Sequence, residues 1–374
     1  MKIAVNTRLL IDGKLSGIGW FAYHTLKRIV KNNPRHQFIF LFDRKYDEQF
    51  IFGPNVIPEV VFPPTRHPIL QHIWFNYSII PVLKKHKPDL FYSPEGYSSL
   101  RLGKIPSLVV LHDINFVHYP KDVPFADSIY MRYFLKKYSQ KADRSITVSE
   151  FSKSDICKEF TIPPDKINVA CNAASEVFSE VSLSERNNIK NELTDGCDYF
   201  IYIGALLPRK NLARLLQAFD KFKEEIVSDV KLLIIGEKMF KTADIENAFR
   251  LMKFKNDVIF AGRLYPGQIE KAMGAALALT YVSYFEGFGL PIVEAMNCNV
   301  PVITSNVTSM PEVAGDAALL IDPFSVESIK NALSEIYLNQ RLREELITKG
   351  SERKKLFNWD ISANKFWKII EKHL

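Results

Sequence analysis

Short apolar runs rich in β-branched residues alternate along the chain with longer segments in which apolar residues recur at helical spacing. The clearest helical stripe consists of Ile18, Phe21, Ala22, Leu26, Ile29 and Val30. The short runs predict strands over residues 2–6, 37–42, 90–93, 107–112, 144–148, 199–203, 230–235, 257–260, 277–282, 301–304 and 318–321. Further helices are predicted over residues 128–140 and directly after Ser149. This alternation is typical of an α/β fold with parallel sheets.

A polar stretch interrupts the pattern between residues 173 and 196, where the sequence SLSERNNIKNE indicates a linker and a short surface helix. We therefore expect an N-terminal Rossmann-like domain over residues 1–178 and a C-terminal one over residues 179–356. Residues 357–374 predict a C-terminal helix that crosses back and packs on the N-terminal domain. The two domains are expected to face a central cleft, because open parallel sheets bind ligands beyond the carboxyl ends of their strands.

The composition is that of a globular protein, since 47% of the 374 residues are apolar and 24% are charged. The net charge is +7, and residues 1–175 hold all of the positive excess, with 24 Lys and Arg against 15 Asp and Glu. This asymmetry favours halves that face different partners, although ordinary solvated surfaces would also produce it. Nucleic acid is not an expected partner, because the chain has no run of five Lys or Arg and no zinc-finger or RNP-type pattern.

The sequence predicts a cytoplasmic location. The first residues, MKIAVNTRLL, lack the apolar core of a signal peptide, and no stretch is long and apolar enough to predict a transmembrane helix. The four cysteines are scattered, without the spacing of a disulfide framework or a zinc site: Cys157, Cys171, Cys197 and Cys298.

The most informative stretch is LTYVSYFEGFGLPIVEAMNCNVPVITSN, which indicates a strand, a glycine-rich turn, a short helix and a second strand. Gly287 and Gly289 allow a positive φ, and Pro291 suits the first turn of the helix. The free N–H groups and the positive dipole end of this helix would point at the turn, a natural site for phosphate or sugar oxygens. Glu286 and Glu294 flank the turn. The alternative is a plain strand-to-helix connection, in which the only role of Glu294 is a favourable interaction of its negative charge with the helix dipole.

Taken together, these residues resemble the retaining glycosyltransferases of family 4, which have the GT-B fold and an E-x7-E motif within EGFGLPxxEAM. Glu286 to Met296 reproduce that motif. Similar agreement is found at Ser16–Gly19, Leu111–Asp113, Thr147–Ser152, Gly204, Pro208–Asn211, Val300–Val302, Pro311–Val313 and residues 317–323. The chain departs from the pattern at Val282, at Asn172–Ala174 and at Asn299, where Asn is the next best residue to Gly for a left-handed position after a helix.

The resemblance implies that a nucleotide-diphosphate sugar is the donor and that the C-terminal domain holds it. Glu286 would contact hydroxyls of the transferred sugar, and Glu294 would accept hydrogen bonds from both ribose hydroxyls, since a carboxylate offers two oxygens. The donor would also contact the phosphate-binding segment at Gly204 and the backbone N–H groups of Phe288, Gly289 and Leu290.

Arg209 and Lys210 would stabilise the negative charge that the diphosphate gathers as the glycosidic bond breaks. The alternative is a solvated pair at a helix start, but cations there oppose the helix dipole. No Asp has a second Asp two positions later, so the Asp-x-Asp pattern that chelates a divalent ion is absent from the sequence. We therefore expect an enzyme without a metal ion or another cofactor.

Three residues of the N-terminal half are further candidates. Gly17 and Gly19 directly precede an amphipathic helix and would cradle phosphate, or would form a plain turn. His112 ends a predicted strand and would hydrogen-bond the donor sugar or the leaving group, unless it is a core histidine. Asp113 is interpreted as a capping residue.

The acceptor is expected to meet the N-terminal domain. Cations and aromatic residues are mixed over residues 131–138 and at Arg66, His67, His72, Trp74, Phe75, Tyr77, Lys84, Lys85 and Lys87. Such a surface suits an anionic membrane, although a core aromatic face with exposed lysines has the same composition. We expect peripheral attachment to the cytoplasmic face of the membrane and a glycan acceptor linked to polyprenyl diphosphate.

The resemblance implies retaining transfer of a hexose to a cell-surface polysaccharide. GDP-mannose is slightly favoured as the donor, because the chain loosely resembles bacterial mannosyltransferases of surface polysaccharide synthesis. UDP-sugar donors for glucosyl, galactosyl or N-acetylhexosaminyl transfer remain open, because no residue identifies the base. The rivals are a sugar-nucleotide epimerase of the same fold and a non-catalytic subunit that binds the nucleotide sugar. The resemblance implies retention by a front-face route, in which the leaving phosphate takes the acceptor's proton. A retaining glycosidase would instead need an acid and a nucleophile about 5 Å apart across the scissile bond, whereas Glu286 and Glu294 lie at opposite ends of the turn.

Overall fold

The computed structural model describes residues 1–15, 17–237, 242–265 and 267–372. The chain forms two compact units, each built around one sheet. Unit 1 comprises Met1–Asn172 together with Trp359–Leu374, and unit 2 comprises Ala173–Asn358. Both sheets contain only parallel pairs among their described strands, as the alternating pattern predicted.

The sheet of unit 1 has seven strands in the order β3-β2-β1-β4-β5-β6-β7. The strands are β1 (Lys2–Asn6), β2 (Gln37–Phe42), β3 (Val56–Val60), β4 (Leu90–Ser93), β5 (Ser107–Val110), β6 (Arg144–Thr147) and β7 (Ile167–Val169). Sequence analysis missed the two edge strands. β3 contains a proline and is half-exposed, which weakens its alternating pattern, and β7 has only three residues.

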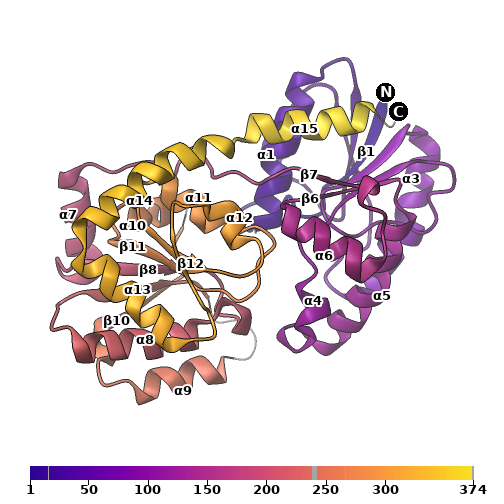
Figure 1. Ribbon diagram of the computed structural model, residues 1–374. Helices are drawn as coiled ribbons and strands as arrows, with labels where there is room; N and C mark the ends of the chain where they lie inside the picture. The colour runs from indigo at the N-terminus through magenta and orange to yellow at the C-terminus, as the bar shows by residue number, and fades with distance from the viewer. Residues whose placement is uncertain (16, 238–241, 266, 373–374) are drawn as a thin grey trace. The chain divides into compact units, whose positions relative to one another are not determined.

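The helices of unit 1 are α1 (Gly17–Asn32), α2 (Pro68–Ile73), a π-helical turn (Trp74–Ser78), α3 (Ile79–His86), α4 (Asn115–His118), α5 (Phe125–Lys141), α6 (Glu150–Phe160) and α15 (Trp359–Glu371). The final helix, α15, packs on α1 (Figure 1). Trp359 stacks on His24 with ring centroids 4.9 Å apart, and Phe366 meets Phe21 at 5.5 Å. Helix α15 therefore completes the core of unit 1.

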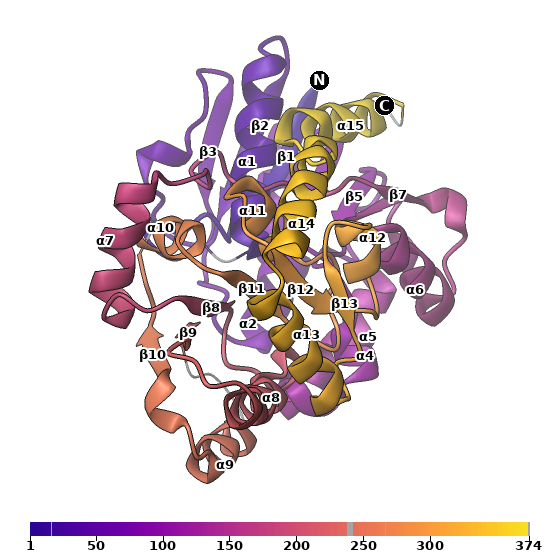
Figure 2. The same cartoon turned by 60° about the vertical axis from the view of Figure 1, so that its left-hand side comes forward.

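The sheet of unit 2 has six strands in the order β10-β9-β8-β11-β12-β13. The strands are β8 (Tyr199–Ile203), β9 (Lys231–Ile235), β10 (Val258–Gly262), β11 (Ala278–Tyr281), β12 (Val302–Ser305) and β13 (Leu319–Ile321). The helices are α7 (Leu183–Thr194), α8 (Leu212–Glu225), α9 (Ala243–Leu251), α10 (Gln268–Gly274), α11 (Leu290–Asn297), α12 (Met310–Ala314), α13 (Val326–Leu338) and α14 (Gln340–Arg353). α8 and α13 pack side by side over one core cluster (Figure 2).

Short 3₁₀ turns join several of these elements: Glu48–Phe50, Pro120–Asp122, Pro164–Lys166, Pro208–Lys210, Lys255–Asp257 and Lys354–Leu356. The strand order reverses between β1 and β4 in unit 1 and between β8 and β11 in unit 2. Open α/β sheets bind ligands at such points, beyond the carboxyl ends of the strands. The fold therefore marks one candidate site in each unit.

Candidate active site

The candidate residues of unit 2 lie at its switch point, because Gly204 follows β8 and the loop of Glu286 follows β11. Two backbone segments approach each other closely here. Gly236, which follows β9, has a φ of 155°, and a Cβ atom at this position would lie 1.9 Å from the carbonyl oxygen of Gly204. Only glycine fits at position 236, which sequence analysis did not single out although the residue directly follows a predicted strand.

Two cations converge on one carboxylate oxygen beyond these strands. Nη1 of Arg209 donates to Oε1 of Glu286 at 2.9 Å, and Nζ of Lys210 lies 2.6 Å from the same oxygen. Lys210 also donates to the hydroxyl of Tyr281 at 2.8 Å. Glu286 is buried, and the three charged side chains come from two loops that are far apart in sequence. The structure therefore brings three of the four predicted catalytic residues together and adds Tyr281, which ends β11.

Hydrogen bonds fix both loops. Thr308 Oγ1 accepts from the N–H of Glu286 at 3.3 Å, and Ser309 Oγ donates to the carbonyl of Glu286 at 2.9 Å. Asn211, with a φ of 62°, donates from Nδ2 to carbonyls just past β11 and β13, at 3.0 and 2.7 Å. The turn Pro208–Lys210 is thereby tied to the strand that leads to Glu286.

The environment separates the protonation states of the two motif glutamates. Burial by itself would raise the pKa of Glu286, but the charges of Arg209 and Lys210 outweigh it and lower this pKa to about 2. Burial, together with the charge of Glu270, raises the pKa of Glu294 to about 8, and Lys210 opposes this shift. At neutral pH Glu286 is therefore an ionised acceptor, whereas Glu294 is largely a neutral acid.

The helix that carries Glu294, α11, begins at the glycine turn as predicted. Gly289 has a φ of 95°, and Pro291 lies in the first turn. Asn299, beyond the end of the helix, has a φ of 54°, which confirms the predicted left-handed position. Because the first N–H groups of a helix have no intrahelical acceptor, the start of α11 presents donors and positive dipole charge at Leu290.

Phe288 contributes its backbone rather than its side chain to this turn. Its ring is buried and meets the ring of Phe357 edge to face, with centroids 5.5 Å apart. Gly204, the remaining candidate of unit 2, lies beside the side chain of Lys210, whose Cδ and Cε atoms would be 3.7 Å from a Cβ at position 204. The predicted donor-binding residues of unit 2 are thus found around the two cations and the start of α11.

His112 lies at the carboxyl end of β5 in unit 1. Its Nε2 lies 3.0 Å from the carbonyl oxygen of Pro94, which can only accept, so Nε2 carries the proton. Burial lowers the pKa of His112 and keeps the ring neutral, which leaves Nδ1 as an acceptor. The neighbouring Asp113 accepts from the N–H of Asn115 at 3.0 Å, but Ile114 is the N-cap residue of α4, so Asp113 orients the loop rather than caps the helix.

Gly17 and Gly19 were predicted to precede the helix, but the structure places both in the first turn of α1 (Gly17–Asn32). Phe21 of the same helix meets the ring of His112, with centroids 4.8 Å apart. Gly19 is tightly packed, since a Cβ there would lie 3.2 Å from the carbonyl oxygen of Leu9. A Cβ at Gly17 would meet no atom within 4 Å. Packing therefore accounts for Gly19 but not for Gly17. Ser16, the first residue of the predicted loop, lies outside the described residues.

Sequence analysis missed a buried polar network at the switch point of unit 1. Arg8 pairs with Glu95, whose Oε1 also accepts from Nδ2 of Asn6 at 2.6 Å. Arg8 further donates to Thr65 Oγ1 at 3.1 Å and lies 5.0 Å from the ring centroid of Tyr97. The signal was present in the sequence, because polar residues directly follow the predicted strands 2–6 and 90–93.

Comparisons with known proteins show the family to which the chain belongs. Residues 15–175 match the family described as Glycosyltransferase Family 4, and residues 184–353 match Glycosyl transferases group 1. The O-antigen chain mannosyltransferase B of Escherichia coli is 31% identical over 279 residues, which cover 74% of this chain and 73% of the relative. The chain is a family 4 glycosyltransferase.

Other relatives of this glycosyltransferase include the O-antigen chain mannosyltransferase RfbU of Salmonella typhimurium, 28% identical over 76% of this chain and 75% of the relative. Among solved structures, the sucrose-phosphate synthase of Thermosynechococcus elongatus has a TM-score of 0.80 at 17% identity, over 100% of this chain and 98% of that one. HepE of Anabaena, solved with UDP and glucose, has a TM-score of 0.76 at 17% identity over the whole of both chains. The predicted GT-B fold is therefore confirmed.

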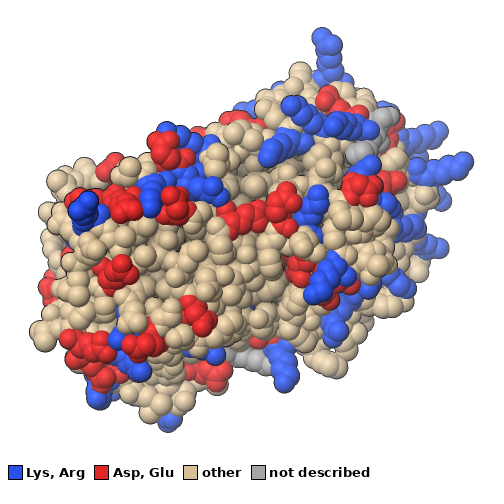
Figure 3. Space-filling view, in the orientation of Figure 1, with Lys and Arg blue, Asp and Glu red and all other residues tan. Residues whose placement is uncertain are grey.

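The structure corrects part of the predicted membrane surface of the glycosyltransferase. Trp74 and Phe75 belong to the core of unit 1 and are fully buried. Tyr77 and Tyr133 of the predicted surface are exposed, by 54% and 53%. Tyr133 shares one face of α5 with Phe125 and Ile129, which are 81% and 55% exposed. On the face drawn in Figure 3, Lys and Arg gather over unit 1 and the two signs are mixed over unit 2. In the described part of the chain, every helix is too short or too polar to span a bilayer.

Among the residues that the structure describes, one group of potential metal ligands is found, and it lies in unit 1. His118 Nε2 lies 2.8 Å from Oδ1 of Asp155, and a carboxylate oxygen of Glu159 is within 4.8 Å of both ligand atoms. The hydrogen bond between His118 and Asp155 accounts for this arrangement, which belongs to unit 1, whereas the cations paired with Glu286 belong to unit 2.

Proposed function

We propose that this glycosyltransferase moves a hexose from a nucleotide-diphosphate sugar to a growing cell-surface glycan, with GDP-mannose as the favoured donor. The convergence of Arg209 and Lys210 on the single oxygen of Glu286, beside the start of α11, carries the proposal. Mannose and a polysaccharide acceptor are supported by the two O-antigen mannosyltransferases among the relatives.

Arg209 and Lys210 are proposed to stabilise the leaving nucleoside diphosphate. The phosphate oxygens gain negative charge as the glycosidic bond breaks, and fixed cations stabilise that state more than the ground state. The carboxylate of Glu286 holds both cations in place before the donor binds, so that little reorganisation is needed later. Two positive side chains together with the dipole of α11 would replace a divalent ion, so we propose that transfer is independent of metal.

Glu286 is proposed to accept hydrogen bonds from hydroxyls of the transferred sugar, because it is ionised at neutral pH. Glu294 is proposed to accept from both ribose hydroxyls once it has lost its proton. Backbone N–H groups of Phe288, Gly289 and Leu290 would bind sugar or phosphate oxygens, and the absence of a side chain at Gly204 leaves room for phosphate beside Lys210.

Two residues of unit 1 are proposed to complete the donor and acceptor contacts. His112 offers Nδ1 as an acceptor for a sugar hydroxyl, because Nε2 is committed to the carbonyl of Pro94. Gly17 leaves open space at the start of α1, where N–H groups would receive a phosphate or sugar oxygen. For these reasons we retain both residues as site candidates, and we assign Gly19 to packing.

The reaction is proposed to retain the anomeric configuration, with the acceptor's proton passing to the leaving phosphate at the front face of the sugar. We further propose a lipid-linked glycan acceptor and peripheral attachment to the cytoplasmic face of an anionic membrane. The exposed apolar face of α5 supports this attachment, and Arg132 and Lys137 lie on the same helix and are also exposed. Cations beside exposed aromatic residues are the combination that suits a lipid headgroup layer.

UDP-sugars are the alternative donors, and HepE, a protein of the same fold, was solved with UDP and glucose. The deciding experiment incubates the enzyme with GDP-mannose, UDP-glucose, UDP-galactose or UDP-N-acetylglucosamine and a glycan acceptor. Transfer from GDP-mannose with retained configuration, detected by NMR of the product, supports the proposal. A donor that is only epimerised would establish the epimerase, and binding of every donor without turnover would establish the non-catalytic subunit.

A further inference from the structure

A cavity of about 210 Å³ lies in unit 2 at the edge of the sheet opposite the candidate active site. Asp198 precedes β8, Leu277 precedes β11 and Pro301 precedes β12, and all three residues line it. Gly204 and Glu286 follow two of the same strands at their other ends. The cavity is therefore separated from the site of the sugar donor by the length of the sheet.

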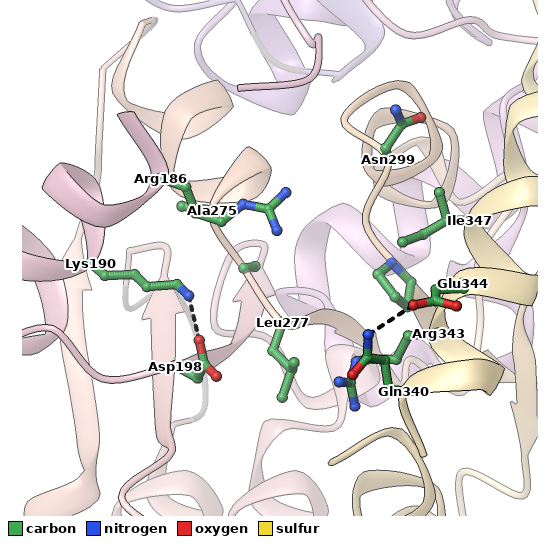
Figure 4. Close-up of a pocket in the computed structure, with 12 residues that line it drawn as sticks. Arg186, Lys190, Asp198, Ala275, Leu277, Asn299, Gln340, Arg343, Glu344 and Ile347 are labelled. Carbon is green, nitrogen blue, oxygen red and sulfur yellow. Dashed lines mark hydrogen bonds and ion pairs between the residues drawn. The ribbon is translucent and has the colours of Figure 1, made fainter. Parts of the chain in front are cut away.

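One face of each of two helices closes the cavity. Arg186 and Lys190 lie four residues apart on α7, and Gln340, Arg343, Glu344 and Ile347 recur at helical spacing on α14 (Figure 4). Apolar atoms of Leu277 and Ile347 cover part of the wall. The lining thus combines charged groups with an apolar surface.

Four of the five charged side chains of the lining already form ion pairs or hydrogen bonds within the protein. Lys190 pairs with Asp198, and Glu344 accepts from Gln340 at 2.9 Å. Nη1 of Arg343 donates to the last carbonyls of α13 at 2.6 and 3.0 Å.

Arg186 is the exception among the described residues of the lining. Its Nε atom is buried and has no hydrogen-bond partner, and Figure 4 shows its guanidinium group extending into the cavity. A buried guanidinium donor without an acceptor is costly, and an anionic group in the cavity would satisfy it.

We propose that this cavity binds a small organic anion, a carboxylate or a phosphate monoester, whose charged group pairs with Arg186. A planar guanidinium group matches the two oxygens of either anion in a forked geometry. The apolar part of the ligand packs on Leu277 and Ile347. Sites for drug-sized ligands measure roughly 300–1,000 Å³, so this cavity takes a smaller molecule than a nucleotide sugar. The site is distinct from the proposed donor site.

Isothermal titration calorimetry of the full chain with glycerol 3-phosphate, inorganic phosphate and acetate, at constant ionic strength, tests the site. Each probe is titrated without and with saturating GDP or UDP, whichever binds, so that binding at Arg209 and Lys210 is distinguished from binding in the cavity. We expect saturable binding of at least one probe, weakened at least tenfold by Arg186→Met. Arg341→Met is the matched control, because Arg341 is an exposed residue of α14 outside the lining, and it leaves the affinity unchanged.

Arg186→Lys keeps the charge without the fork, and we expect it to bind with intermediate affinity. If Arg186→Met fails to fold, Arg186→Lys still tests the proposal. Lysine keeps the positive charge but cannot form the forked pair, so the affinity for the probe should still fall measurably. Absence of saturable binding by all three probes would overturn the proposal. So would equal affinity of the wild-type protein and a folded Arg186 variant, or loss of the binding when nucleotide is added.

Discussion

The Nζ atom of Lys210 lies 2.6 Å from Oε1 of Glu286, the same oxygen that accepts a hydrogen bond from Arg209. One buried carboxylate oxygen therefore positions both cations proposed to meet the diphosphate. Substitutions here should therefore have two different effects. Replacing a cation removes charge that stabilises the leaving group, whereas replacing Glu286 removes the group that orients the cations.

Arg209→Met should lower kcat about 100-fold or more while the Kd of the donor changes less than tenfold, because charge stabilisation is greatest in the transition state. Steady-state kinetics together with calorimetry of donor binding separate the two quantities. Arg341→Met, which removes an exposed arginine of the same unit, is the control and should retain wild-type kcat. Unchanged kcat in Arg209→Met would remove this residue from the mechanism.

Metal independence predicts that EDTA leaves the rate of transfer unchanged, since the two side chains already supply the positive charge. The measurement compares initial rates after dialysis against EDTA with rates in added Mg²⁺ or Mn²⁺. Activity lost on chelation and restored by either ion would contradict the role given to Arg209 and Lys210.

Affinity for the donor should rise with pH between about 6.5 and 9, because the pKa of Glu294 is raised to about 8 and the ribose hydroxyls donate to its ionised form. Binding at pH 7 should therefore release a proton, measurable as a dependence of the calorimetric enthalpy on the buffer. Glu294→Gln should bind more weakly and show no such pH dependence. A wild-type affinity that is independent of pH would exclude the proposed ribose contact.

Acid should selectively remove the stabilisation that Glu286 provides. Its pKa in the folded chain, about 2, lies below the ordinary value of 4.5, so this contribution is fully present above pH 4.5 and is lost as the pH falls toward 2. The shift corresponds to about 3 kcal/mol. Chemical unfolding of wild type and Glu286→Gln at pH 7 and pH 3 should show a smaller acid-induced loss in the variant. Equal losses would mean that the ion pairs contribute no net stability.

Gly236→Ala should destabilise the fold by more than about 3 kcal/mol, because its Cβ would lie 1.9 Å from the carbonyl oxygen of Gly204 at a strained φ. We expect the Tm to fall by at least about 6 °C. Gly17→Ala is the matched control, since its Cβ meets open space, and its Tm should not fall. Differential scanning calorimetry measures both variants, and a wild-type Tm for Gly236→Ala would refute the proposed close approach.

Membrane attachment should depend on the exposed face of α5. Replacing Phe125, Ile129 and Tyr133 by Ser should abolish flotation with vesicles that contain phosphatidylglycerol, because these side chains would enter the headgroup layer. Replacing the exposed Val227 and Leu251 of unit 2 by Ser should have no effect. Binding of the wild type should weaken with salt, and flotation of the α5 variant at the wild-type level would exclude this surface.

The sequence was sufficient to predict most of the fold, because strands buried on both faces appear as uninterrupted apolar runs. The sequence also predicted the glycine turn and the helix that follows it. Pro291 indicated the first turn of that helix, and Asn299 indicated the left-handed residue beyond its end. The family resemblance, rather than periodicity, linked Arg209 and Lys210 to Glu286. Their contact depends on two loops that are more than seventy residues apart.

What the sequence could not reveal depends on packing between distant segments. The pKa of Glu294 reflects burial and the charge of Glu270 on α10, neither of which has a local pattern. Gly236 is required by the carbonyl of Gly204, which directly follows the neighbouring strand β8. Composition alone placed Trp74 on a membrane surface, but the π-helical turn directs it into the core, where its Nε1 donates to a carbonyl at 2.7 Å.

The packing of α15 on α1 also affects the order in which the protein matures during synthesis. All of unit 2 is translated between Phe21 and His24 and the residues that cover them, Phe366 and Trp359. The first part of unit 1 therefore waits with an apolar face of α1 uncovered until α15 has been synthesised. A nascent chain stalled before residue 359 should accordingly bind chaperones through α1, and release should coincide with the emergence of α15 from the ribosome.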